Sequence, residues 1–191
     1  MSLVVVTGAV RSGKSRAAER MAASRGGDVV VAVAGWDGDA EMARRIGAHR
    51  ASRPAGWDVR VVGPDTEWLA GVSDGSVLLL DCLATLVGAI AWEEAGDAEV
   101  ASEDAESRAV ERTDALVEAL AERVGDTLVV TNEAGWGVVP ASAAGRLFRD
   151  LLGRANRALV TRADAAWLAI DGRFVDLGTL PAEPGWPAEG D

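Results

Sequence analysis

The sequence predicts an α/β protein with a mostly parallel sheet flanked by helices, and three observations support this prediction. Uncharged runs rich in β-branched residues alternate with stretches whose apolar residues have helical spacing. The pattern G-x-x-x-x-G-K-[ST] occupies residues 8–15, between the first such run and the first helical stretch. Two strand-like runs joined by Asp171-Gly172 predict a C-terminal β-hairpin. We therefore expect one domain over residues 1–180, followed by a proline- and glycine-rich flexible tail over residues 181–191.

In the first half of the chain, valine-rich runs predict strands buried on both faces of the sheet, and glycine or proline ends the helices between them. Gly26-Gly27 follows the first helix, and Arg53-Pro54 follows the second. The expected elements, in order, are a strand over residues 3–7, a helix over 15–25, a strand over 28–33, a helix over 40–50, a strand over 59–62 and a helix over 65–72.

The second half is expected to contain the central helix of the domain, because residues 82–92 are apolar on nearly all sides. Residues 93–108 carry seven acidic residues and one arginine, which predicts a solvated loop or the start of a helix, and a role as a lid stays open. The other expected elements are a strand over residues 76–80, an amphipathic helix over 111–124, a strand over 127–131, a helix over 143–161 and the hairpin strands 165–170 and 173–177.

Composition and charge exclude several classes of protein. The formal net charge of −11 argues against general nucleic-acid or membrane-surface binding, because such surfaces repel an acidic protein. Asp81 interrupts the longest apolar stretch, residues 77–92, so no membrane insertion is expected, and the single cysteine, Cys82, allows no internal disulfide. We expect a cytoplasmic protein. Residues 1–60 have a formal net charge of +4, and residues 61–191 have one of −15. The positive charge is therefore concentrated in the part of the sequence that contains the glycine-rich loop.

Lys14 is the only lysine of the chain, and the other eighteen Lys and Arg residues are all arginines. Its compact ammonium can lie between β- and γ-phosphate oxygens, where a planar guanidinium would be too wide. Backbone N–H groups and a helix N-terminus are expected to bind the phosphates, while Ser15 binds Mg²⁺. The pattern predicts a bound nucleoside triphosphate but not the reaction. The phosphate loop consists of Gly8, Ala9, Val10, Arg11, Ser12, Gly13, Lys14 and Ser15.

Two more strand ends carry polar side chains. Asp81 follows a buried run, as the acid of a Walker B segment does, which predicts a place on the magnesium side of the nucleotide. Its alternative role is the N-cap of the helix that begins at Cys82, and the sequence does not separate the two. Thr131-Asn132-Glu133 ends another buried strand and is expected at the same edge of the sheet, with capping or turn formation as the simpler explanation.

His49 is the only histidine, and two interpretations of it stay open. It shares a helical stripe with Met42 and Ile46, which is typical of a packed core residue. Nearby cations instead favour a place beside a triphosphate and the neutral, nucleophilic imidazole, whose attack on phosphorus would form a phosphoramidate. The arginines within five residues of His49 are Arg44, Arg45, Arg50 and Arg53.

Four blocks of the chain, in their order and with their gaps, resemble the adenosylcobinamide kinase / adenosylcobinamide-phosphate guanylyltransferase family of cobalamin biosynthesis. The resemblance covers about residues 3–177, and the first block alone would be generic. The blocks are residues 7–15; Glu41-Met42 with Arg45-Ile46, His49, Arg53-Pro54 and Trp57; Thr131-Asn132-Glu133 with Gly135, Gly137 and Val139-Pro140; and Arg149-Asp150 with Gly153-Arg154 and Asn156.

The resemblance implies an activity and a site. Members of this family phosphorylate the aminopropanol hydroxyl of adenosylcobinamide with GTP or ATP. They then attack GTP with a histidine and transfer the GMP to adenosylcobinamide phosphate, which gives adenosylcobinamide-GDP. The resemblance also implies a RecA-like P-loop NTPase fold and a homotrimer. His49 matches the guanylylated histidine, and the other nucleotide-contacting positions outside the loop match Val33, Ala34, Gly35, Arg50, Ala51, Ser52, Arg53 and Asp81.

Two positions depart from the family pattern. Val61 stands where the family has a glutamate that contacts the nucleotide, and Asp81 stands where the family often has a glutamate. Two other functions remain open at this point: an ordinary P-loop small-molecule kinase with a structural histidine, and a non-catalytic nucleotide-binding switch.

Overall fold

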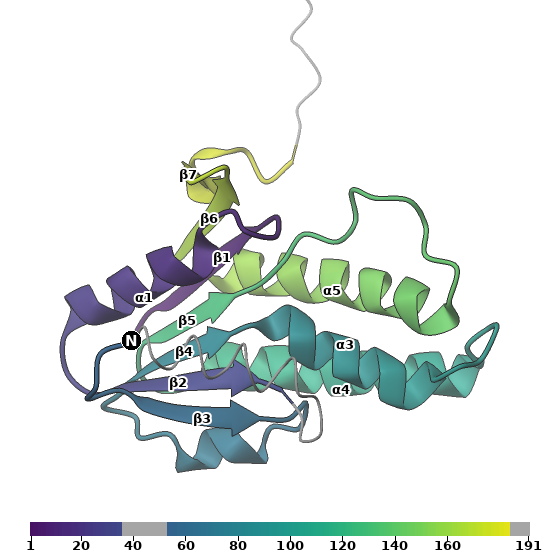
Figure 1. The fold of residues 1–191 in the computed structure, drawn as a ribbon, viewed down its shortest axis with the longest axis horizontal. Helices are drawn as coiled ribbons and strands as arrows, with labels where there is room; N and C mark the ends of the chain where they lie inside the picture. Colours follow the sequence, from purple (N-terminus) through teal and green to yellow (C-terminus); the bar gives the residue numbers. More distant parts are fainter. Residues whose placement is uncertain (36–52, 184–191) are drawn as a thin grey trace, which may run out of the picture.

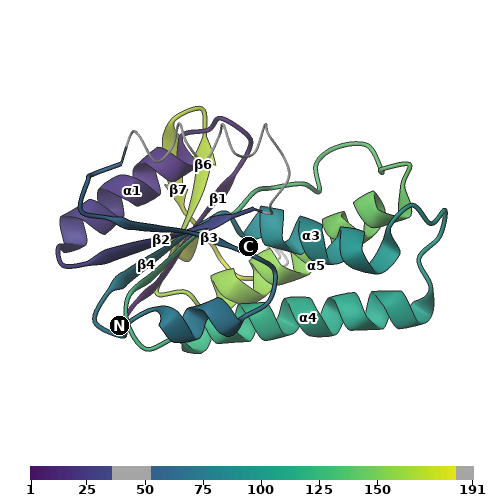
Figure 2. The same cartoon turned by 60° about the horizontal axis from the view of Figure 1, so that its bottom comes forward.

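The computed structural model describes residues 1–35 and 53–183, which form a seven-stranded sheet with helices on both faces (Figures 1 and 2). The strand order is β3-β2-β4-β5-β1-β6-β7. The last pair, β6 and β7, is antiparallel, and every other pair is parallel. The predicted mostly parallel sheet with a C-terminal hairpin is therefore confirmed.

Each predicted strand is present, and its ends lie within one residue of the expected ones. The parallel register aligns the strands at their carboxyl ends, where Asp81 pairs with both Val33 and Val130. Side chains and loops that follow these strands therefore meet at one edge of the sheet. The strands are β1 (Leu3–Gly8), β2 (Val29–Ala34), β3 (Asp58–Val62), β4 (Val77–Asp81), β5 (Thr127–Val130), β6 (Ala165–Ile170) and β7 (Arg173–Asp176).

Three of the four α-helices in the described residues closely match the predicted ones. The expected helix over residues 40–50 and most of the expected tail, from residue 184 on, lie outside the described residues. The helices are α1 (Lys14–Arg25), α3 (Leu83–Ala95), α4 (Glu103–Glu122) and α5 (Ala143–Arg162), with short 3-10 helices η1 (Glu67–Gly71) and η2 (Leu177–Thr179).

Two predictions differ from the structure in length. The helix expected over residues 65–72 is only the short 3-10 helix η1. The helix expected over residues 111–124 begins eight residues earlier, because the hydroxyl of Ser102 accepts a hydrogen bond from the N–H of Ala105 and caps the start of α4. Acidic residues in its first turn also stabilise this start, because negative charges interact favourably with the positive end of the helix dipole. The prediction of a helix start within residues 93–108 is thus confirmed.

The acidic stretch connects α3 with α4, far from the phosphate loop. Glu94 near the end of α3 accepts hydrogen bonds from Arg108 and Arg112 of α4. These ion pairs hold the pKa of Glu94 below its usual value, chiefly through the hydrogen bond from Arg108. In Figure 1 the α3–α4 connection lies at the right edge, while the loop between β1 and α1 lies near the top centre.

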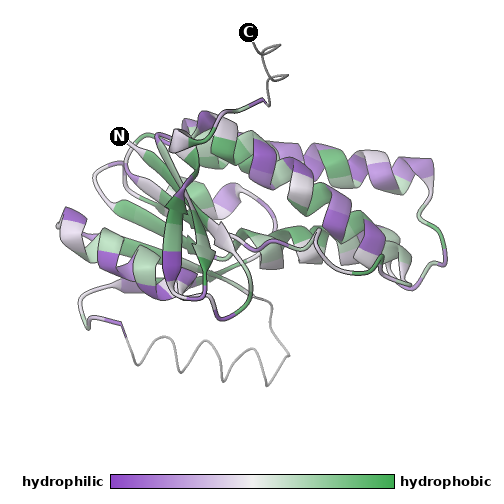
Figure 3. Ribbon diagram, turned by 90° about the horizontal axis from the view of Figure 1, so that it is seen from above, coloured by the Kyte–Doolittle hydropathy of each residue, from purple (hydrophilic) through white to green (hydrophobic). Residues whose placement is uncertain are grey.

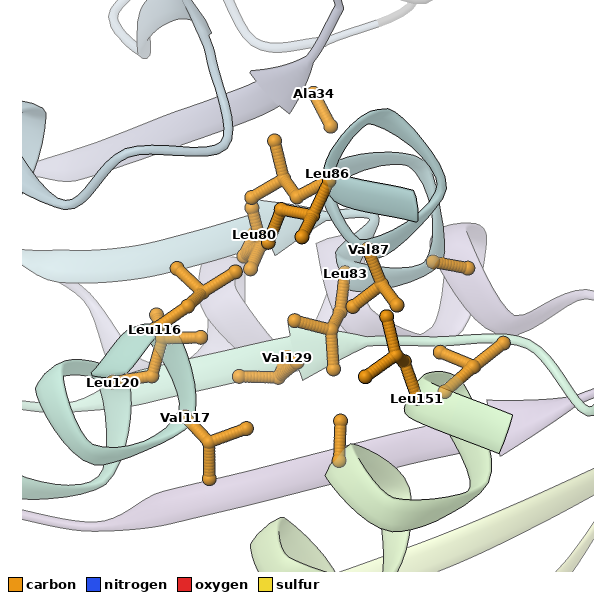
Figure 4. Close-up of a cluster of buried hydrophobic side chains, with 14 of the residues drawn as sticks. Ala34, Leu80, Leu83, Leu86, Val87, Leu116, Val117, Leu120, Val129 and Leu151 are labelled. Atoms are coloured by element: carbon orange, nitrogen blue, oxygen red, sulfur yellow. The ribbon is translucent and has the colours of Figure 1, made fainter. Parts of the chain in front are cut away.

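The core has two parts because strand side chains alternate between the faces of the sheet. On one face, Val6, Val31 and Leu79 pack with alanines of α1. On the other face, a larger cluster joins the sheet to α3, α4 and α5, as Figure 4 shows. Figure 3 shows the apolar strands between helices with polar outer surfaces. In residues 1–35 and 53–183, no helix is both long and apolar enough to cross a membrane.

Candidate active site

The phosphate loop leaves the sheet at Gly8, where only glycine fits. A Cβ atom on Gly8 would lie 2.3 Å from the carbonyl oxygen of Ala169 in β6, and the φ angle of Gly8 is +141°. The loop then reaches Gly13, which is the N-cap of α1 at a φ angle of 93° and gives α1 no side-chain cap. The first N–H groups of α1 are thus left for an anion, as the phosphate-loop pattern requires.

The tip of the C-terminal hairpin supports the loop from the side. The N–H of Gly172 donates to the carbonyl oxygen of Ser12 over 3.1 Å. Asp171 and Gly172 both have positive φ angles, of 47° and 77°, which is the requirement of a type I′ turn. The hairpin predicted from Asp171-Gly172 therefore contributes to the shape of the phosphate loop.

Lys14 is buried, and its ammonium lies within the loop. The Nζ atom donates to the carbonyl oxygen of Ala9 over 2.8 Å. Burial lowers the pKa of Lys14, while the nearby Cys82, Asp81 and Glu133 raise it. Lys14 therefore lies near Asp81 and Glu133, the acidic residues at or just after the ends of β4 and β5 that the sequence placed at this edge of the sheet. Ala9, Val10 and Arg11, which precede it in the loop, are exposed.

Asp81 lies beside Ser15, and both of its carboxylate oxygens are hydrogen-bonded. The hydroxyl of Ser15 donates to Oδ1 over 3.0 Å, and Arg53 donates to Oδ2 over 2.9 Å. The N-cap of α3 is Cys82, not Asp81, so the capping role considered for Asp81 is wrong. Cys82 is itself half-buried, and burial raises the pKa of its thiol, as a packed cysteine requires.

The oxygen atoms of Ser15 and Asp81 are ligands that suit Mg²⁺. Within the described residues, no group of three or more His, Cys, Asp or Glu side chains could hold a metal ion. A site made of one hydroxyl and one carboxylate fits Mg²⁺ because this ion usually keeps several waters and takes its other ligands from substrate phosphates.

Arg53 joins α1 to the end of β4, a contact that the sequence did not indicate. Its side chain is 1% exposed, and Nε donates to Glu19 of α1 over 2.8 Å while Nη2 donates to Asp81. Nη1 has no hydrogen-bond partner in the described part of the chain. Glu19 lies 34 residues before Arg53. No local pattern marks such a pair.

A second network lies at the end of β5, between the ends of β1 and β4. The hydroxyl of Thr7 donates to Oε1 of Glu133. Asn156 of α5 donates to the carbonyl oxygen of Asn132 over 2.9 Å and accepts from the hydroxyl of Thr131 over 2.7 Å. Thr131-Asn132-Glu133 is therefore at the expected edge, and it is more than a local turn.

The remaining predicted residues fall into two groups. Val33 and Ala34 end β2 with buried side chains, so only their backbone is available to a ligand, and the N–H of Gly35 bonds to the carbonyl oxygen of Val62. Gly35 and Val61 line a largely apolar pocket of about 990 Å³ beside α3, in which Val61 is 52% exposed. Those outside the described residues are His49, Arg50, Ala51 and Ser52.

The sheet order separates the strand of the phosphate loop from the strand of Asp81 by one strand, β5. This arrangement, with Lys14 and Ser15 on one side and Asp81 on the other, defines a P-loop nucleotide-binding protein with a RecA-like sheet. The chain belongs to the cobinamide kinase / cobinamide phosphate guanyltransferase family, whose model matches residues 4–177.

Three curated relatives match nearly the whole chain. "Bifunctional adenosylcobalamin biosynthesis protein CobU" of Escherichia coli (strain K12) is 33% identical over 182 residues, covering 92% of this chain and 99% of that protein. The protein of the same name from Salmonella typhimurium is 34% identical over 180 residues, with the same coverage. "Bifunctional adenosylcobalamin biosynthesis protein CobP" of Pseudomonas aeruginosa is 34% identical over 181 residues, covering 93% of this chain and 98% of that protein.

A solved structure supports the fold alone. The Pyrococcus horikoshii OT3 protein studied as Project ID PH0250 superposes with a TM-score of 0.52 at 9% sequence identity. The superposition covers 95% of this chain and 88% of that one.

Proposed function

We propose that this protein phosphorylates adenosylcobinamide with GTP or ATP and then transfers GMP from GTP to adenosylcobinamide phosphate, giving adenosylcobinamide-GDP. The observation that carries the proposal is the family match over residues 4–177, which includes both the phosphate loop and the segment around His49. The relatives named as bifunctional adenosylcobalamin biosynthesis proteins match over almost their full length.

In the kinase step, the aminopropanol oxygen attacks the γ-phosphorus, and the bond to the β–γ bridging oxygen breaks. Lys14 and the free N–H groups of α1 would stabilise the charge on the phosphate oxygens. Ser15 and Asp81 would hold Mg²⁺, which when bound neutralises phosphate charge.

In the transfer step, an imidazole nitrogen of His49 attacks the α-phosphorus of GTP, and the bond to pyrophosphate breaks. A phosphate oxygen of adenosylcobinamide phosphate then attacks the same phosphorus, and the P–N bond breaks to restore the histidine. Arg53 supports this assignment, because it stands four residues after His49 in the sequence and bonds to Asp81. The nucleotide-contacting residues of the proposal are those of the phosphate loop together with Val33, Ala34, Gly35, Arg50, Ala51, Ser52, Arg53 and Asp81.

We also propose that residues 1–180 form a single catalytic domain, that the protein is cytoplasmic, and that it assembles as a homotrimer. The family resemblance supports the trimer. The net charge of −11 argues against nucleic acid or an anionic membrane surface as a partner, because both would repel the protein. Light scattering coupled to gel filtration tests the trimer, since a monomer mass would contradict it.

Intact-mass spectrometry after incubation with GTP and Mg²⁺ tests the covalent mechanism. We expect a mass increase of one GMP, release of pyrophosphate, and no mass increase in a His49→Ala variant. A His49→Ala variant that gains GMP as the parent does would contradict the mechanism. Transfer of the γ-phosphate alone, without pyrophosphate release, would instead support an ordinary kinase. Lys14→Ala serves as the control that should lose the GMP adduct along with nucleotide binding.

A further inference from the structure

Glu133 lies at a place in the sheet that brings it beside the phosphate loop. It comes three residues after β5, the strand between β1 and β4. Its backbone N–H donates to the carbonyl oxygen of Gly8 over 3.3 Å, and Oε1 accepts from the hydroxyl of Thr7, the residue before the loop. Both the backbone and the side chain of Glu133 are thus attached to the start of the loop.

One oxygen of the Glu133 carboxylate is held by two hydrogen bonds, and the other has none from the described part of the chain. Oε1 also accepts from Nδ2 of Asn156 over 3.4 Å, and Asn156 is itself held by Thr131 and Asn132. Oε2 has no hydrogen bond to any residue among 1–35 and 53–183. Glu133 is half-buried, and the hydrogen bonds to Oε1 restrict the position of its carboxylate.

The two other carboxylates in this region, Asp81 and Glu19, are both engaged by Arg53. Asp81 uses one oxygen for Ser15 and the other for Arg53, and Glu19 accepts from Arg53. Lys14 lies close enough to Glu133 for their charges to interact, since the pKa of Lys14 is lowered by burial and raised by Cys82, Asp81 and Glu133. Considering only contacts among residues 1–35 and 53–183, Glu133 is the one of these three carboxylates that combines an oxygen without a hydrogen bond with a charge interaction with Lys14, the lysine that is to bind the γ-phosphate.

We infer that Glu133 is the general base of the kinase half-reaction, which rests on the function proposed above. As the aminopropanol oxygen attacks the γ-phosphorus, its O–H bond breaks and the proton moves to Oε2 of Glu133. The O–P bond forms, the bond to the β–γ bridging oxygen breaks, and the nucleoside diphosphate leaves. The proton then passes from Glu133 to solvent, which restores the carboxylate.

The second half-reaction does not need this base. Its nucleophiles are a neutral imidazole nitrogen and a phosphate oxygen that is largely deprotonated at neutral pH, and neither has to lose a proton in the attack. Loss of the Glu133 carboxylate should therefore separate the two activities.

The test is Glu133→Gln, which keeps the acceptor for Thr7 but cannot take up a proton. We expect kcat for GTP-dependent phosphorylation of adenosylcobinamide to fall by about 10²–10⁴-fold, with little change in KM for GTP. Labelling of the protein with GMP from GTP should proceed at the parental rate. The pH profile of kcat should differ between the parent and Glu133→Gln, whereas the pH profile of GMP labelling should be the same in both.

The matched control is Asp114→Asn, which removes a carboxylate from an exposed ion pair with Arg154 and should leave both activities unchanged. If Glu133→Gln does not fold, Glu133→Asp decides, because its shorter carboxylate should lower kcat while GMP labelling is retained. A kcat equal to that of Asp114→Asn, or parallel loss of kcat and GMP labelling, would overturn the inference. A parent protein that phosphorylates no adenosylcobinamide would contradict the proposed function itself, and the inference with it.

Discussion

At the scale of single residues, Arg53 has the most demanding environment in the site. Its guanidinium is buried and bonds to Glu19 and Asp81, which are only 19% and 14% exposed. Removing one partner of a buried ion pair leaves the other charges without compensation. Arg53→Ala should therefore lower the free energy of unfolding by about 3 kcal/mol, measured by urea titration without nucleotide. Arg154→Ala breaks an exposed pair with Asp114 and should cost less than about 1 kcal/mol. Equal losses in the two variants would contradict this view of Arg53.

Gly8 is the second position where one atom decides the outcome. Gly8→Ala would force a shift of β6 or of the loop, because the new Cβ would meet the backbone carbonyl of Ala169. We expect GTP affinity, measured by calorimetry, to fall at least tenfold. Gly153→Ala is the matched control: Gly153 lies within α5, and a Cβ atom there would meet nothing within 4 Å, so alanine should stabilise the protein by about 0.5–1 kcal/mol and leave GTP affinity unchanged. Unchanged affinity in Gly8→Ala would show that the loop tolerates the shift.

At the scale of elements, Arg25 at the end of α1 is bonded to Asp126, the residue immediately before β5. The hydrogen bond from Arg25, with the nearby N-terminus, lowers the pKa of Asp126 from 3.8 to about 2. Because the folded pKa lies below the unfolded one, this contact contributes stability above pH 4 that is lost as the pH falls toward 2. Asp126→Asn should therefore lower the unfolding free energy at pH 6 more than at pH 2.5. Asp97→Asn, at an exposed position, should show no such difference.

The strands and most helices could be predicted because each has a local signal. Strands such as β2 are continuous valine-rich runs that are buried on both faces. The start of α4 was expected only as one of two alternatives, a loop or a helix start within residues 93–108, since its first two turns are mostly charged and lack an apolar stripe. The pattern that marks this start in the sequence is Ser102 followed by acidic residues, which is typical of a helix N-terminus. The length of η1 was overestimated, as a helix over residues 65–72, because apolar residues alone do not determine where a helix ends.

The candidate site could be predicted only where its residues lie next to each other in sequence or at strand ends. Ser15 and Asp81 were expected to meet, and their side chains are 3.0 Å apart. The contacts of Arg53 with Glu19 and of Glu133 with Thr7 join residues that are 34 and 126 positions apart. Such contacts depend on the order of strands in the sheet, which local sequence patterns do not encode.

At the scale of the whole molecule, one phosphate loop would have to serve two reactions at different phosphorus atoms of the nucleotide. Binding would then depend on Lys14 and the N-terminus of α1, while the covalent step would depend on His49. The two roles can be separated by measuring how a ligand stabilises the folded protein, since a ligand that binds only the folded state raises its melting temperature.

A non-hydrolysable GTP analogue at about 100 times its Kd should stabilise the parent by about 2.7 kcal/mol, or roughly 5–10 °C in Tm. Tryptophan fluorescence can follow the transition, because the chain has seven tryptophans. Lys14→Ala should lose this shift. His49→Ala should keep it while losing the GMP adduct, because an attacking group contributes to the transition state more than to binding of the ground state. A His49→Ala variant that also loses the shift would mean that His49 holds the nucleotide rather than attacking it.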